Sequence, residues 1–168
     1  MTAVVARMNP VQARAWLALV TTAQLLPAVL DEQLTQDAEL IHFEFGILDT
    51  LRRAPERTMR MGELAAAVAS TAPRLSKAIS RMERRGLVER FSCRGDGRAI
   101  NIRLTDQGRR SWLRAVPPHI ELARDTLLAD LSEDQLTALA EMLEPIIARL
   151  DPEGAFGRLE DSTPSSSA

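Results

Sequence analysis

Apolar residues recur every three to four positions through most of this chain, which places them on one face of successive helices. The first helix is predicted to begin at Asn9 and Pro10, a capping side chain followed by a residue that needs no amide donor. Pro27 is expected to kink this helix. Its apolar stripe consists of Trp16, Leu19, Val20, Ala23, Leu26, Leu30 and Leu34.

A second helix is predicted between Glu39 and Arg53, and Pro55 closes the segment. A short strand around Thr58 to Arg60 is expected to follow. The apolar face of the second helix is formed by Ile41, Phe45, Leu48 and Leu51.

After this strand, the sequence predicts two short helices separated by only a few residues, which is the pattern of a helix-turn-helix motif. The first spans Glu63 to Ala69, and residues 70–72 form the turn. Thr71 is placed to cap the second helix, residues 72–85, which carries Pro73 in its first turn. The core-facing residues are Leu64, Ala65 and Val68 in the first helix and Leu75, Ala78, Ile79 and Met82 in the second, whose other faces carry Arg74, Ser76, Lys77, Ser80, Arg81 and Arg84.

The pattern changes from helical to extended after Gly86, a helix C-terminal cap, and residues 87–104 predict a β-hairpin. Residues 87–92 and 98–104 form the strands, and the Gly-Asp-Gly sequence at 95–97 supplies the turn. A hairpin in this position is a wing. In its second strand Ile100, Ile102 and Leu104 alternate with Asn101 and Arg103.

Two further helices are predicted after the hairpin. Thr105 caps the first, which reaches about Asp130 and is expected to bend at the Pro-Pro pair at 117–118. A capping box at 132–135 begins the second. The apolar residues are Leu113, Val116, Ile120, Ala123 and Leu127 in the first, at the spacing of a helix packed along a partner, and Leu136, Leu139, Leu143, Ile146, Ile147 and Leu150 in the second.

Composition narrows the class of protein. Hydrophobic residues make up 45% of the chain but aromatic residues only 4%, so the core must be mainly aliphatic, which favours packed helices. No apolar run approaches the roughly 20 residues of a membrane span, and no signal peptide is legible, so a cytoplasmic protein is expected. Cys93, His42 and His119 lie far apart in sequence, so no metal site or cofactor is predicted. The sequence shows neither a phosphate-binding glycine loop nor a recognisable nucleophile–base pair, so an enzyme is not predicted.

The net charge of −2 conceals a segregation of charge along the chain. Residues 74–114 hold twelve Lys or Arg and four Asp or Glu, a balance of +8, so the rest of the chain carries −10. A basic segment of this kind is typical of a surface that binds phosphates, because each neutralised phosphate releases condensed counterions. Its overlap with the helix-turn-helix and the wing favours DNA binding over a merely solvated face.

These residues resemble the MarR family of bacterial transcriptional regulators over nearly the whole chain, residues 9–150. The most specific match is the wing, where Asp96-Gly97-Arg98 precedes the Ile-Arg-Leu-Thr-Asp-Gln-Gly sequence at 102–108. Residues 63–65 and 82–88 also match. The resemblance implies a mainly α (α+β) fold, a winged helix-turn-helix with flanking N- and C-terminal dimerisation helices.

The resemblance also implies a homodimer that presents two winged helix-turn-helix domains, its reading heads, to a palindromic operator. Residues 1–36 are then an N-terminal dimerisation helix, 37–104 the DNA-binding domain, 105–150 the C-terminal dimerisation helices and 151–168 a largely disordered tail. The apolar stripes lead to the same expectation, because one motif and one wing cannot cover three long helices. Half-sites are expected roughly 10 base pairs apart. The chain is therefore interpreted as a sequence-specific transcriptional regulator, a repressor.

Side chains on the basic face are assigned to DNA according to the chemistry of each groove. Arginine and lysine match guanine edges in the major groove, and guanidinium groups are drawn to a narrow minor groove. For Ser80, Arg81 and Arg84 a solvated face is the alternative. The assignments are Arg74, Ser76 and Lys77 to bases, Ser80, Arg81 and Arg94 to the DNA backbone, and Arg98 to the minor groove, where by family analogy Asp96 orients it through an ion pair.

Members of the family commonly release DNA when a small aromatic or anionic ligand binds between the dimer helices and the reading head. Such an effector is therefore a candidate partner here. No ligand motif is legible, and a core or surface role is the alternative for each candidate. The candidate lining residues are Trp16, His42, Phe45, Asp49, Trp112 and His119.

Two other functions remain open at this point. Cys93 lies beside the wing, where Arg90 and Arg94 could activate the thiol for redox sensing, although a passive thiol explains it as well. The helices could instead form a protein-interaction module that does not bind DNA.

Overall fold

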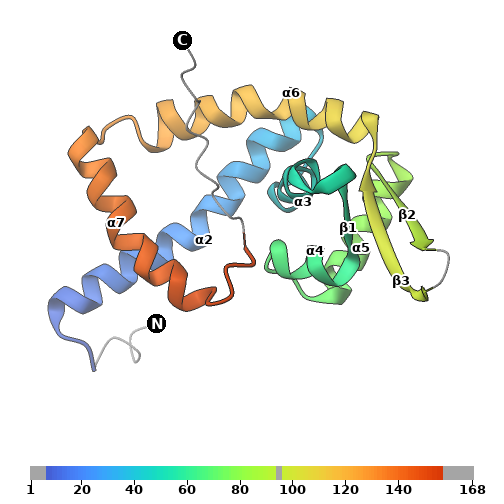
Figure 1. The fold of residues 1–168 in the computed structure, drawn as a ribbon. Coiled ribbons are helices and arrows are strands. Elements are labelled where there is room, and N and C mark those ends of the chain that lie inside the picture. Colours follow the sequence, from blue (N-terminus) through green and yellow to red (C-terminus); the bar gives the residue numbers. More distant parts are fainter. Residues whose placement is uncertain (1–6, 94–95, 157–168) are drawn as a thin grey trace, which may run out of the picture.

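The computed structural model describes residues 7–93 and 96–156, and of residues 93 and 96–99 it describes the backbone alone. Helices make up most of the molecule, and a small antiparallel sheet lies at one end (Figure 1). This arrangement confirms the predicted mainly α (α+β) fold class. Residues 157–168 of the predicted disordered tail lie outside the described residues.

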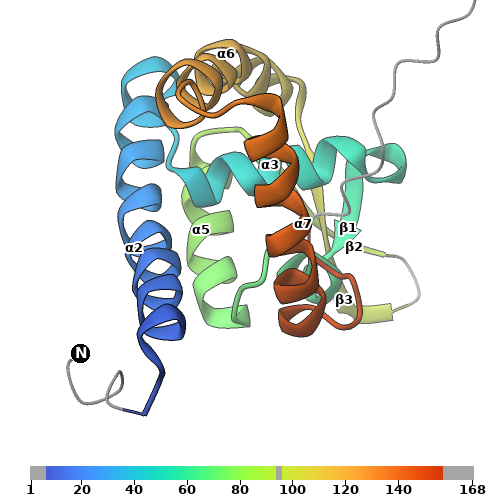
Figure 2. The ribbon, with the colours of Figure 1, turned by 90° about the vertical axis from the view of Figure 1, so that its left-hand side faces the viewer.

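In chain order the elements are α2 (Pro10–Ala38), α3 (His42–Arg53), η1 (Pro55–Arg57), β1 (Thr58–Arg60), α4 (Met61–Ala67), α5 (Ala72–Arg84), β2 (Val88–Cys93), β3 (Asp96–Leu104), α6 (Asp106–Leu122), η2 (Ala123–Leu127) and α7 (Glu133–Leu150). Helix α6 runs from the sheet at one end of the molecule toward α7 at the other (Figure 1). Helix α2 packs along α6. Figure 2 looks onto the end opposite the hairpin, where α2 and α7 stand in the foreground.

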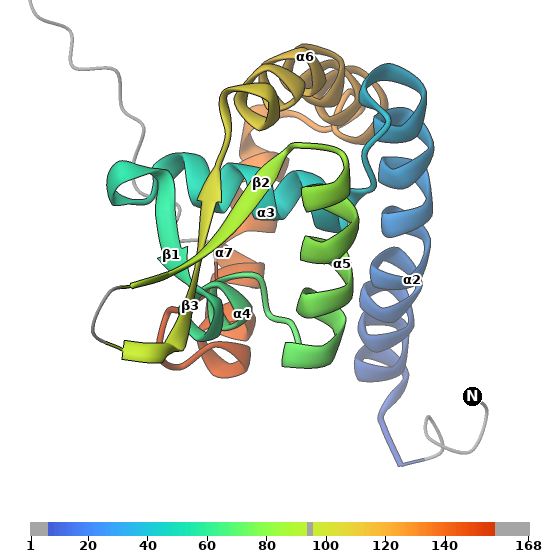
Figure 3. The ribbon, with the colours of Figure 1, turned by 90° about the vertical axis from the view of Figure 1, so that its right-hand side faces the viewer.

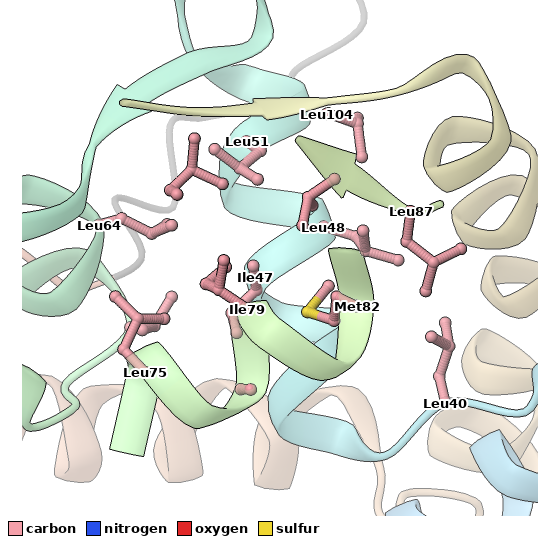
Figure 4. Close-up of a cluster of buried hydrophobic side chains, with 14 of the residues drawn as sticks. Leu40, Ile47, Leu48, Leu51, Leu64, Leu75, Ile79, Met82, Leu87 and Leu104 are labelled. Carbon is pink, nitrogen blue, oxygen red and sulfur yellow. The ribbon is translucent and has the colours of Figure 1, made fainter. Parts of the chain in front are cut away.

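A continuous hydrophobic core joins α3, α4, α5 and the sheet (Figure 4). The side chains of Leu48, Leu64 and Ile79, from three different helices, are fully buried in it. The predicted core face of α5 is confirmed, because all four of its members are at most 1% exposed: Leu75, Ala78, Ile79 and Met82. The opposite face of α5 is thereby turned to solvent.

The sheet has the order β1-β3-β2, and β3 differs from its prediction in two ways. It begins at Asp96, so the Asp-Gly pair assigned to the turn belongs to the strand. Asn101 is 7% exposed while Ile100 is 44% exposed, so the expected alternation fails there. The reason is the position of β3 between two neighbours: Asn101 lies opposite both Arg60 and Phe91, whereas Ile100 lies beyond the end of β1.

Local capping signals were reliable guides to helix starts. Asn9, Thr105 and Ser132 each accept a hydrogen bond from the backbone of the first helical turn, as predicted. Thr71 occupies the N-cap position of α5, but its side chain makes no capping hydrogen bond, so that detail of the prediction is wrong.

Two helix boundaries also differ from prediction. Helix α3 begins at His42 rather than Glu39, because Glu39 adopts a left-handed conformation with φ 55° that ends α2. Leu40, in the connection, is fully buried. The helix predicted to reach Asp130 ends in the π-helical turn η2, where the N–H of Leu128 donates to the carbonyl oxygen of Ala123.

Helix α2 corrects the expectation that no segment is apolar enough to cross a membrane. By length and composition alone it could do so, since an 18-residue stretch has a mean hydropathy of 1.4. The prediction considered uninterrupted apolar runs, whereas small polar residues such as Thr21 and Thr22 interrupt the run without greatly lowering its mean. The C-terminal half of α2 buries Leu30, Leu34 and Ala38, which also suits a helix that packs against protein.

The end of α5 is joined directly to the start of α6. Gly86 has φ 69°, and the N–H groups of Gly86 and Leu87 donate to the carbonyl oxygens of Glu83 and Met82, a Schellman cap. The Thr105 hydroxyl group contacts the carbonyl oxygens of Gly86 and Leu87 at 2.6 and 3.0 Å. The amide of Gln107 donates to the carbonyl oxygen of Arg85 at 2.9 Å. These bonds give the Leu-Thr-Asp-Gln-Gly sequence a structural role.

A second junction brings α2, α3 and α6 together. The carboxylate of Asp31 accepts the backbone N–H of His42 at 2.6 Å and so satisfies the first turn of α3. The Nδ1 atom of His119 lies 3.1 Å from the side-chain oxygen of Gln33, and its ring lies 4.7 Å from that of Phe45. The rings of His42 and His119 are 6.2 Å apart, so two titratable groups share this junction.

Gly108 provides a test of the α5–α6 junction. A Cβ atom added there would lie 2.1 Å from the Leu87 carbonyl oxygen, so Gly108→Ala must displace backbone. We expect it to lower the free energy of unfolding by more than about 2 kcal/mol in urea denaturation. Gly62→Ala is the matched control: a Cβ at this helical glycine meets no atom within 4 Å, and alanine should be neutral or stabilise by up to about 1 kcal/mol. Equal stability of the two variants would contradict the close packing.

The histidine junction predicts a pH dependence of stability. Desolvation lowers the pKa of His42, opposed by Asp31, and desolvation followed by the charge of His42 lowers the pKa of His119. The two histidines therefore take up protons more readily in the unfolded chain than in the folded chain. Their contribution to the free energy of unfolding is fully present above pH 6.5, the ordinary pKa of histidine, and is lost as the pH falls below that value.

We expect the melting temperature to fall between about pH 7.5 and 5.5, and the His42→Gln/His119→Gln double variant to show a shallower fall. Gln36→Asn, on the exposed surface of α2, serves as a control that should keep the wild-type profile. A double variant with an unchanged profile would show that these histidines do not govern the effect.

Candidate nucleic-acid interface

The candidate interface lies at the end of the molecule that carries α5 and the β2–β3 hairpin (Figure 3). Because the core face of α5 is buried, the remaining faces present Arg74, Lys77 and Arg81 to solvent. These three residues also line a groove of about 330 Å³ between the start of α3 and α5, together with Ile41, Phe43, Pro73 and Ala78. The site therefore combines exposed cations with a partly apolar floor.

Arg74 is held from one side only. The central carbon of its guanidinium group lies 4.3 Å from the centroid of the Phe43 ring, a cation–π contact. Among the described residues, no hydrogen bond or ion pair involves the Arg74 guanidinium group or the Lys77 ammonium group, so their donors are available to a ligand.

Arg81 is placed differently, because Glu44 binds it. The Glu44 side chain is only 4% exposed, and its Oε1 atom accepts hydrogen bonds from Nε and Nη2 of Arg81 at 3.3 and 3.2 Å. Its Oε2 atom pairs with Arg85 at 3.1 Å. Arg85 also donates to the carbonyl oxygen of Glu39. One buried carboxylate thus ties α5 to α3.

Ser76 and Ser80 contact the wing strand rather than solvent alone. The Nη2 atom of Arg90, on β2, donates to the Ser76 carbonyl oxygen at 2.9 Å and to the Ser80 hydroxyl oxygen at 2.8 Å. The Ser80 hydroxyl donates in turn to the Ser76 carbonyl oxygen. Glu83 pairs with Arg90 at 3.5 Å. These bonds fix the orientation of the hairpin relative to α5.

The tip of the hairpin carries the remaining predicted DNA residues. Arg94 lies outside the described residues, and so do the side chains of Cys93, Asp96 and Arg98. The described base of the hairpin contains an ion pair between Arg103 and Glu89.

Five of the six candidate effector residues lie in two groups, and Trp16 belongs to neither. His42, Phe45 and His119 lie together at the α2–α3–α6 junction. Asp49 and Trp112 are joined through Arg52, which pairs with the carboxylate at 3.3 Å and lies 4.2 Å from the indole centroid. Trp16 is 43% exposed on α2, away from both groups in the described contacts. Within residues 7–93 and 96–156, no group of three or more His, Cys, Asp or Glu side chains is placed to bind a metal ion.

Sequence reasoning missed Phe43, Glu44 and Arg90 as parts of this interface. A signal for Glu44 was present, because it occupies a core-facing position of α3, between Leu40 and Leu48 at four-residue spacing. A carboxylate on an apolar stripe indicates a buried ion pair. No comparable signal identified Arg90, whose partners lie on another element.

Comparison with known proteins agrees with this geometry. Residues 40–99 match the model of the MarR family. The HTH-type transcriptional regulator PecS of Dickeya dadantii (strain 3937) is 36% identical over 102 residues, which span 60% of this chain and 60% of PecS.

Two solved structures from Streptomyces coelicolor are similar over more of the chain. Sco3205, a MarR family transcriptional regulator in complex with DNA, has a TM-score of 0.79 and 33% identity, covering 85% of this chain and 93% of its own. AbsC, another MarR family regulator, has a TM-score of 0.78 and 30% identity, covering 86% and 97%. Proteins of this family regulate transcription and are not enzymes. These findings confirm the resemblance seen in the sequence: the chain belongs to the MarR family of transcriptional regulators.

Proposed function

We propose that this protein binds a palindromic DNA operator as a homodimer in the cytoplasm and represses transcription. The observation that carries the proposal is the exposed face of α5, where Arg74 and Lys77 keep their donors free beside the wing. Such donors match base edges in a major groove. The similar Sco3205 has been solved in complex with DNA, which supports DNA binding by this chain.

Roles for individual residues follow from their surroundings. Arg74, Ser76 and Lys77 are assigned to bases. Ser80 and Arg81 are assigned to the DNA backbone, and each would exchange a protein partner for a phosphate group on binding. The wing supplies Arg94 to the backbone and Arg98 to the minor groove, with Asp96 orienting Arg98.

The dimer is proposed from apolar surface that the single chain leaves uncovered. In the described part of the chain, α7 has no buried residue, and Met142, Ile147 and Leu150 are 64%, 50% and 80% exposed. Leu25 on α2 is 62% exposed. Faces of this kind usually pack against a partner. We assign residues 1–36 and 105–150 to the dimer and 37–104 to DNA binding.

A small aromatic or anionic effector is proposed to bind near the α2–α3–α6 junction and release DNA. The grouping of His42, Phe45 and His119 at that junction supports this placement. To release DNA, the effector must bind more tightly to a conformation of the dimer in which the spacing of the two reading heads differs from that of the DNA-bound conformation. An effector with equal affinity for both conformations would not shift the equilibrium between them.

The proposed function predicts a salt-sensitive footprint. On DNA flanking its own gene, the protein should protect two half-sites roughly 10 base pairs apart. The logarithm of the binding constant should fall linearly with that of the salt concentration, by about 0.9 per neutralised phosphate. Binding that barely changes with salt, or no footprint at all, would favour a protein-interaction module instead.

Substitutions on α5 and on the wing should have different effects. Lys77→Ala should remove discrimination at one base pair of each half-site, a loss of about 1–3 kcal/mol for the preferred base. Arg98→Ala should weaken binding to all sequences alike, by about tenfold, the value of one charge-assisted contact. Electrophoretic mobility shifts on the footprinted DNA and on single-base variants measure both. Wild-type affinity and preference in both variants would contradict the assignments.

A further inference from the structure

The contact between Phe43 and Arg74 joins the first turn of α3 to the first turn of α5. The guanidinium carbon lies 4.3 Å from the ring centroid. Phe43 is partly buried and packs against the main hydrophobic core, so the core holds its ring in place. Arg74 is exposed at the N-terminal end of α5, the end from which a helix in the major groove reaches base edges.

Other arginines of α5 have different surroundings. Nε and Nη2 of Arg81 donate to Glu44, and Nε of Arg84 donates to the carbonyl oxygen of Ser80. Arg74 is restrained by an aromatic face instead, and no hydrogen bond to its guanidinium group occurs among the described residues. It is therefore positioned without the use of any of its five N–H donors.

This difference bears directly on base recognition. An arginine binds guanine through two N–H donors in a fixed planar geometry. A flexible arginine side chain loses conformational entropy when it binds, and this loss lowers the affinity. A cation held over a ring has fewer conformations to lose, while its donors stay free. Lys77, three residues further along α5, has no such restraint among the described contacts.

We propose that Phe43, which lies outside the DNA-facing helix, is a positioning residue that sets the base preference of Arg74. The proposal rests on the proposed function, because it requires α5 to read bases. It makes the start of α3 a determinant of operator choice.

The test is a selection of DNA by the full-length protein from a pool of random duplexes of about 24 base pairs, long enough for two half-sites one helical turn apart. Five proteins are compared: wild type, Phe43→Leu, Phe43→Tyr, Arg74→Ala and the Phe43→Leu/Arg74→Ala double variant. Leucine keeps an apolar side chain in the core but removes the ring, whereas tyrosine keeps the ring. Melting temperatures confirm that each variant is folded, and salt titrations report its phosphate contacts.

We expect Arg74→Ala to abolish the preference at one base pair of each half-site. Phe43→Leu should weaken the preference at that same pair by about two- to fivefold, the contribution of an exposed cation–π contact. Phe43→Tyr should retain it, and the double variant should match Arg74→Ala. The salt dependence of DNA binding by Phe43→Leu should equal that of wild type. A general loss of structure in α5 would instead change it.

Several results would overturn the proposal. Phe43→Leu could keep the full preference, or lose affinity for all sequences equally, or change the preference at other base pairs. In each of those cases, selection of a palindrome by the wild type would leave the proposed function standing. Failure of the wild type to select any sequence would overturn both.

Discussion

The carbonyl oxygen of Leu87 accepts a hydrogen bond from the backbone N–H of Thr105, and the Thr105 hydroxyl group contacts the carbonyl oxygens of both Gly86 and Leu87. Leu87 follows α5 and Thr105 precedes α6, so these bonds fix the end of α5 to the start of the helix that runs to the far end of the molecule (Figure 1). The two hairpin strands also meet here, where Val88 pairs with Leu104. Gly108 is required at this point because the Leu87 carbonyl group occupies the space of a side chain.

Local sequence signals accounted for most of the helices and for the core face of α5, because capping and apolar spacing act within a few residues. They were wrong where a neighbour in space decides the outcome. Asn101 is covered by two adjacent strands, and the start of α3 depends on Asp31, eleven residues earlier in the chain. The candidate site followed the same rule. Exposed arginines and lysines were identifiable from the sequence. The position of Glu44 on an apolar stripe also indicated a buried ion pair, but nothing in the sequence identified Arg81 and Arg85 as its partners.

The charge of the basic segment overstates the number of cations available to DNA. Glu44 lies outside that segment yet binds Arg81 and Arg85, while Glu89 binds Arg103. A buried ion pair adds little net stability, but removal of one partner leaves an uncompensated charge and costs several kcal/mol, about 3–5. Glu44 therefore constrains the orientation of α5 more than it stabilises the fold. Arginines that look alike in the sequence therefore differ in the structure, because among the described residues some are paired with a carboxylate and others are not.

Four consecutive residues at the start of α3 face two different neighbours. His42 and Phe45 contact His119 on α6, and between them Phe43 and Glu44 contact Arg74 and Arg81 on α5. Side chains attached to one helical turn move together when the helix rotates about its axis. Any rotation of α3 that repacks the aromatic junction must therefore also shift the supports of both arginines, so one turn of helix couples two distant surfaces geometrically.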